Sequence, residues 1–211
     1  MAVAQSEGSA LAALKLLPKD VAKRLARIEA RDGAPVPERW HLLVYEPDSE
    51  HGVREFVVAG GRLVAVRTLS QFADTLKPSD VFGGDSVKLD SEQIARWAAL
   101  FAAANGGQVG SLNYELKKDS ELNGPVWTAT ILDPAGDQLG AITVNALKGT
   151  ILDSAGFEKS PAPELLVSPV AAPVTSRPAK LRAAPPTPTP RPNLFRRILG
   201  ANEEKPPMPA R

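Results

Sequence analysis

The sequence predicts an α+β fold made of tandem units, each a helix followed by antiparallel strands, with a disordered proline-rich tail at the C-terminus. Three observations predict it. Residues 126–152 read as three short strands, with apolar side chains alternating along the first two, joined by two turns, a pattern typical of antiparallel strands. A similar pattern occurs at 39–66. Of the 20 prolines in the chain, 13 lie from Glu158 onward, where too few apolar residues remain to build a core.

The two strand-rich segments share more than alternation. Trp40 and Trp127 each begin an apolar stripe, and an acidic residue followed by proline comes six residues later, at 46–47 and 133–134. A helical pattern precedes each segment. We interpret the pair as an internal repeat. The alternative, that two unrelated meanders share this pattern by chance, stays open.

Composition narrows the classes of protein. The hydrophobic fraction of 43% and the charged fraction of 23% are ordinary for a globular chain. The absence of cysteine excludes disulfides, thiol catalysis and cysteine metal sites. From Glu158 onward nine Lys/Arg stand against four Asp/Glu, whereas residues 1–157 contain 16 against 20. An acidic body therefore precedes a basic tail.

Residues 1–18 form an N-terminal extension with a short helical stretch at 9–17. The first unit is expected at 19–76. Val21, Leu25 and Ile28 are spaced for one face of a helix over 19–31, and strands follow from 39 to 68. The other face of this helix is basic, with Lys23, Arg24, Arg27 and Arg31. Acidic residues interrupt it, so a solvated face is favoured over a nucleic-acid stripe.

The second unit is expected at 77–157. A loop at 77–86 lacks the pattern of a phosphate-binding loop. A short connecting strand at 87–89 comes next. Asp90 then caps a helix over 92–104, which places an apolar stripe on its buried face. A half-buried strand at 112–116 and the segment 126–152 complete the unit.

The tail, 158–211, is expected to be extended, because this proline-rich segment buries too little apolar surface to offset the entropy lost on ordering. One apolar and basic island interrupts it at 193–200. Its candidate partner-binding residues are Leu194, Phe195, Arg196, Arg197, Ile198 and Leu199. A proline-rich spacer before such an island is typical of a tethered binding peptide. A groove on a protein partner is favoured, and contact with an anionic membrane surface or docking on the body are the alternatives.

The residues offer little for catalysis, cofactors or metals. His41 and His51 lack a second ligand at metal-binding spacing. The acidic residues in the two turns lack the spacing of a calcium loop, and no hydrolase or kinase motif occurs. No secretory leader or membrane span is recognised either, so a cytoplasmic protein is expected.

The second unit resembles a PepSY-type domain, the small helix-plus-sheet module of peptidase propeptides and many bacterial proteins. The resemblance rests on the helix beginning at Asp90, on residues 126–131, and on the closing strand-turn-strand with its Lys148-Gly149, and it covers 90–152. A degenerate copy covers 19–66. The resemblance implies a non-catalytic module that inhibits or regulates a protein partner, and the family has no catalytic residues to carry over.

The sequence therefore predicts a non-enzymatic protein-interaction or regulatory module with a tethered C-terminal binding peptide. A protein partner is expected, and nucleic acid is not. The alternative function is a small-ligand carrier or an enzyme that uses a pocket between helix and sheet. The oligomeric state and the identity of the partner are left open.

Overall fold

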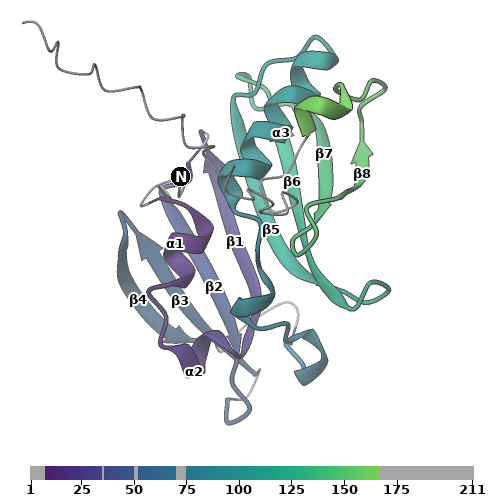
Figure 1. Cartoon of the computed structure of the whole chain (residues 1–211). Coiled ribbons are helices and arrows are strands. Elements are labelled where there is room, and N and C mark those ends of the chain that lie inside the picture. Colours follow the sequence, from purple (N-terminus) through teal and green to yellow (C-terminus); the bar gives the residue numbers. More distant parts are fainter. Residues whose placement is uncertain (1–7, 35, 50–51, 70–74, 167–211) are drawn as a thin grey trace, which may run out of the picture. The chain divides into compact units, whose positions relative to one another are not determined.

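The computed structural model describes residues 8–34, 36–49, 52–69 and 75–166 (Figure 1). They form one antiparallel eight-stranded sheet with the order β4-β3-β2-β1-β5-β6-β7-β8. The strands are β1 Leu25–Gly33, β2 Arg39–Tyr45, β3 Val53–Ala59, β4 Arg62–Thr68, β5 Ser111–Asp119, β6 Gly124–Leu132, β7 Gln138–Asn145 and β8 Ile151–Ala155. The helices are α1 Ala10–Leu14, α2 Lys19–Ala22 and α3 Ser91–Ala104, with short 3-10 turns η1 Pro78–Asp80, η2 Gly84–Ser86 and η3 Pro163–Leu166.

The predicted α+β fold of tandem helix-plus-strand units is wrong. The two strand-rich halves pair with each other through β1 and β5, where Ile28 lies opposite Leu116 and Ala30 lies opposite Tyr114. This pairing makes one continuous sheet with few, short helices instead of an internal repeat of independent units. Sequence alternation identifies strands but does not specify which strands pair, and that choice decided the architecture.

The helix predicted over 19–31 is also wrong. Only Lys19–Ala22 is helical, and β1 begins at Leu25. Ile28 and Ala30 are buried while Glu29 between them is half-buried, which is the alternation of a strand. An irregularity between Leu25 and Arg27 shifts the register, so the apolar spacing mimics a helical one.

Several elements were predicted correctly from local pattern. The helix expected at 92–104 is α3, and the side chain of its N-cap Asp90 accepts a hydrogen bond from the Ser91 amide. The strands expected at 112–116 and 126–152 are also present. Residues 87–89 form no strand. Instead the amides of Lys88 and Leu89 both donate to the Ala146 carbonyl, which ties this segment to the turn after β7.

The two faces of the sheet differ in character. One face carries α1 and α3 and contains the main hydrophobic cluster, to which all the central strands contribute. The opposite face, called the open face here, is largely polar, apart from a small cluster of Ala26, Leu43, Val53 and Leu76. A sheet with one apolar and one polar face accounts for the period-two patterns in the sequence.

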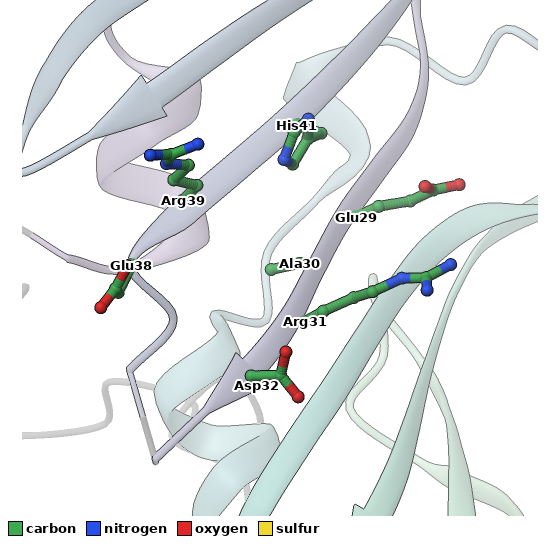
Figure 2. Close-up of a pocket in the computed structure, with 7 residues that line it drawn as sticks. All are labelled: Glu29, Ala30, Arg31, Asp32, Glu38, Arg39 and His41. Carbon is green, nitrogen blue, oxygen red and sulfur yellow. The ribbon is translucent and has the colours of Figure 1, made fainter.

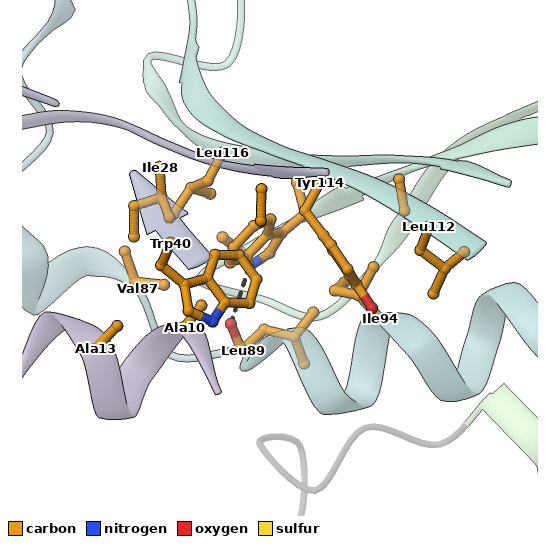
Figure 3. Packing of buried hydrophobic residues seen from close by; sticks show 14 of the residues in the cluster. Ala10, Ala13, Ile28, Trp40, Val87, Leu89, Ile94, Leu112, Tyr114 and Leu116 are labelled. Carbon is orange, nitrogen blue, oxygen red and sulfur yellow. Dashed lines mark hydrogen bonds between the residues drawn. The ribbon is translucent and has the colours of Figure 1, made fainter. Parts of the chain in front are cut away.

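Trp40, Tyr114 and Trp127 all belong to the main cluster. Figure 3 shows Trp40 and Tyr114 within it. The ring centroids of Trp40 and Trp127 are 6.4 Å apart. The ring centroid of Tyr114 lies 5.4 Å from that of Trp40 and 6.3 Å from that of Trp127. Each indole Nε1 donates to the carbonyl of the residue just before a helix N-cap, Gly8 at 2.8 Å and Leu89 at 2.9 Å. Both tryptophans are buried on the same face of the sheet.

The chain remains packed on the body beyond β8. The ring of Phe157 lies 5.6 Å from that of Phe101 on α3. Asn105 accepts hydrogen bonds from the amides of Glu158 and Lys159 and donates one to the Lys159 carbonyl. Leu166 also packs against the main cluster. The tail expected from 158 thus begins with residues held on α3.

Candidate binding groove

An apolar groove with a basic rim lies between the two N-terminal helices and the segment that leads into α3. We call it the basic groove. It has a volume of about 530 Å³. Its lining residues are Leu11, Leu14, Lys15, Leu17, Lys19, Ala22, Lys23, Gly84, Asp85, Val87 and Lys88.

The floor of the basic groove follows from how α1 packs. Ala10, Ala13 and Leu14 face the main cluster and are buried, which leaves Leu11 only partly covered. Leu17 and Val87 are buried at the base. Leu11 and Ala22, both half-buried, are the apolar side chains that a ligand can reach without any rearrangement of the core.

The first wall is fixed by α3. The amide of Ala10 donates to Ser91 Oγ at 3.0 Å, and the amide of Leu11 donates to Asp90 Oδ1 at 3.1 Å. A helix as short as α1 is marginal on its own, so these bonds across the sequence hold it in place. The same Asp90 that caps α3 thereby orients the groove.

The second wall, 84–88, is fixed from both ends. The amides of Phe82 and Gly83 donate to the Leu25 carbonyl, and Lys88 is held by Ala146. Gly84 permits close packing, since a β-carbon there would lie 3.1 Å from the Leu14 side chain. Both walls are thus preorganised, which lowers the entropy lost when a ligand binds.

Four lysines form the rim. Lys15 is the C-cap of α1, Lys19 opens α2 and Lys23 is the C-cap of α2, while Lys88 comes from the opposite wall. All four are exposed. Asp85 supplies the only carboxylate in the lining of this groove. A ligand would therefore meet an apolar floor and a positively charged edge.

A second hollow, of about 660 Å³, lies on the open face where β1 and β2 approach their hairpin (Figure 2). Its lining mixes both charges and consists of Glu29, Ala30, Arg31, Asp32, Glu38, Arg39 and His41. Glu29 is already paired with Arg27 at 3.2 Å. A lining that mixes acidic and basic side chains offers a ligand little net electrostatic preference, so this hollow is a weaker candidate.

Beside this hollow, Glu55 is a buried carboxylate with two basic neighbours. Its side chain lies 2.6 Å from His41 Nδ1 and accepts a hydrogen bond from Arg67 Nε. Only 5% of Glu55 is exposed. Burial raises its pKa, but the hydrogen bonds and charges of Arg67 and His41 outweigh burial and hold the pKa below the usual value of 4.5. The cluster fastens the edge strand β4 to β3 and β2.

Glu55→Gln is expected to cost about 1–2 kcal/mol at neutral pH, because charge-assisted hydrogen bonds become neutral ones. The lowered pKa means that the unfolded state binds the proton more tightly. The stabilisation by the carboxylate is therefore present above pH 4.5 and is lost as the pH falls through the lower folded-state value. Urea unfolding of both proteins across this range checks the prediction, and a difference that grows on acidification would contradict it.

The structure places the sequence-predicted candidates as follows. Residues 194–199, predicted to bind a partner, lie outside the described part of the chain, as do Glu50 and His51. Asp133 has a structural role, because its side chain accepts from the amides of Ala135 and Asp137 within its own turn. His41 binds Glu55. Within the described ranges, no group of three or more acidic or histidine side chains could hold a metal ion.

Sequence reasoning missed the basic groove. Lys23 was assigned to a solvated helix face, and Lys15, Lys19 and Lys88 were not considered. A signal was present, because lysines at 15, 19 and 23 repeat every four residues. The spacing alone could not show that Lys88 lies opposite them.

Comparisons with models of protein families, with curated proteins and with solved structures find no match to this chain. The resemblance of 90–152 to a PepSY-type domain therefore stays a prediction from sequence. Among the described helices, none is both long and apolar enough to cross a membrane.

Proposed function

We propose that this chain is a non-enzymatic protein-interaction module in which the basic groove receives a segment of a protein partner. The groove carries the proposal. Protein-binding surfaces combine an apolar centre with a polar rim. The half-buried Leu11 and Ala22, bordered by lysines, have this arrangement. Hydrogen bonds from α3 and β1 support it by keeping both walls in place.

The island at 193–200 is proposed as a second binding element of the same module, tethered by the proline-rich segment before it. It joins apolar residues to Arg196 and Arg197, so it suits an acidic surface of a partner. A regulatory role follows if the groove and the island hold the same partner, because linking two weak contacts raises the overall affinity. The cytoplasm is the proposed compartment.

A small-ligand carrier is the second candidate. The volume of the basic groove, about 530 Å³, lies within the range of small-molecule pockets. An anionic amphiphile would suit the same floor and rim. The experiment below separates the two functions.

Site-specific photocrosslinking in the native host tests the proposal. A photoreactive residue at Lys19 or at Lys88 of the full chain is expected to give the same protein adduct, since these positions line opposite walls of one groove. Lys117 on β5 and Arg62 on β4 are matched exposed positions outside the groove and are expected to give no such adduct. The same residue placed at Phe195 tests the island.

Two outcomes would contradict the proposed function. Protein adducts of equal yield from all four positions of the body would show unspecific contact. A small-molecule adduct from Lys19 and Lys88, without a protein adduct, would favour the carrier.

A further inference from the structure

We infer that the segment received by the basic groove is acidic and amphipathic, with apolar side chains along one face and carboxylates flanking them. This inference rests on the proposed function and names the chemistry of the partner. It is carried by three observations, which are the charge state of the rim, the placement of the lysines on both walls, and the apolar floor.

Three of the four rim lysines are not neutralised by a carboxylate of the described residues, unlike the cations in several ion pairs of the body. Arg24 pairs with Glu46, Arg67 with Glu55, and Lys117 with Glu115. Within the part of the chain that the structure describes, Lys19, Lys23 and Lys88 form no ion pair. Residues 1–157 as a whole carry more acidic than basic residues. A concentration of lysines on an acidic body, three of them without an ion pair to a described residue, attracts a negatively charged partner and steers it to this site.

The positions of the lysines favour a polymer over a single anionic headgroup. Three come from the helical wall at 15, 19 and 23, and Lys88 comes from the facing wall. An amphiphile with one headgroup needs cations gathered at one end of its site. Cations spread along both walls match a ligand with several negative charges along its length, such as a peptide segment.

The floor specifies the remaining property of the ligand. Leu11 and Ala22 are half-buried and present apolar surface beside the lysines, above the buried Val87. A helix that places leucines at i, i+3, i+4 and i+7 would bury them on this floor and direct glutamates toward both walls. The structure therefore assigns the groove to helix-in-groove recognition of an acidic segment.

The test measures binding of labelled synthetic peptides to the full chain by fluorescence anisotropy. The probe has leucines at the spacing given above and glutamates elsewhere. A second peptide keeps the leucines and replaces glutamate by glutamine, and a third replaces it by lysine. Vesicles rich in phosphatidylglycerol and a free fatty acid, oleate, are tested alongside them. The acidic peptide is expected to bind most tightly, and its affinity is expected to fall with added salt.

A charge-reversal variant with Lys19→Glu, Lys23→Glu and Lys88→Glu is expected to weaken the acidic peptide by roughly tenfold or more. A control with Arg62→Glu, Lys117→Glu and Lys159→Glu makes the same change in net charge outside the groove and is expected to leave the affinity within about twofold. The substituted rim positions are exposed and form no ion pair among the described residues, so the groove variant should keep the thermal melt of the unsubstituted chain.

Three results would overturn the inference. If the glutamine peptide binds as tightly as the acidic peptide, the groove recognises only apolar side chains, and the proposed function stands. Binding of vesicles or oleate but of no peptide, lost in the groove variant, would assign the site to an anionic amphiphile. Binding of no probe at all, together with the absence of crosslinks from Lys19 and Lys88, would overturn both the inference and the proposed function.

Discussion

Trp127→Ala is expected to destabilise the protein by about 3–5 kcal/mol, the largest loss from a single side chain in this structure. The indole is fully buried and contacts the rings of both Trp40 and Tyr114. It also supplies the hydrogen bond to the Leu89 carbonyl, just before α3. The substitution therefore removes core volume and loosens the junction between helix and sheet. Chemical unfolding followed by circular dichroism measures the effect.

A pair of phenylalanine substitutions separates the hydrogen bond from the ring. Trp97 is equally buried, but its Nε1 has no acceptor among the described residues. Trp127→Phe leaves the Leu89 carbonyl without its donor, which costs about 1–3 kcal/mol beyond the loss of volume. Trp97→Phe removes an unsatisfied donor and is expected to cost less. A larger loss for Trp97→Phe would contradict the assigned role of the Trp127 bond.

Gly110→Ala is expected to destabilise the protein by about 3 kcal/mol, the upper end of the range for overpacking. A β-carbon at this position would overlap the carbonyl group of Asp133 and lie 2.5 Å from the Pro134 nitrogen. The obstruction is backbone, so no side chain can rotate away. The Gly110 amide also donates to the Leu132 carbonyl at 2.8 Å, a bond that any displacement would lengthen.

Gly124→Ala is the matched control. Its β-carbon would meet only the Leu122 carbonyl oxygen, at 3.7 Å, and its φ is not in the left-handed region. We expect the melting temperature to stay nearly unchanged. Similar losses at both glycines would show that the requirement at Gly110 is conformational and does not arise from the close approach of β5 to the turn after β6.

Local signals were sufficient to predict part of this fold. The cap at Asp90 and the apolar stripe of Trp97 and Phe101 predicted α3 nearly to the residue. Period-two alternation predicted the strands around Trp40 and Trp127. These predictions succeeded because neighbours in sequence decide them.

The sequence-based predictions failed where contacts between residues distant in sequence determine the structure. The helix predicted over 19–31 includes most of β1, because the irregular register of β1 hides its alternation of apolar and polar residues. Pairing with both β2 and β5 makes this segment a strand. The basic groove could not be predicted for the same reason. Lys88 and Lys19 line the same groove only because η2 packs against α1. A site built from several segments has no contiguous motif.

The most direct measurement of the central claim, that the basic groove is the binding site, is amide chemical-shift mapping by NMR on the full chain titrated with the acidic leucine–glutamate peptide. We expect the largest chemical-shift changes in residues 11–23 and 84–88, which form the two walls of the groove. Residues around Glu29 and His41 on the open face should shift little. Shifts centred on the open face, with the groove amides unchanged, would contradict the account.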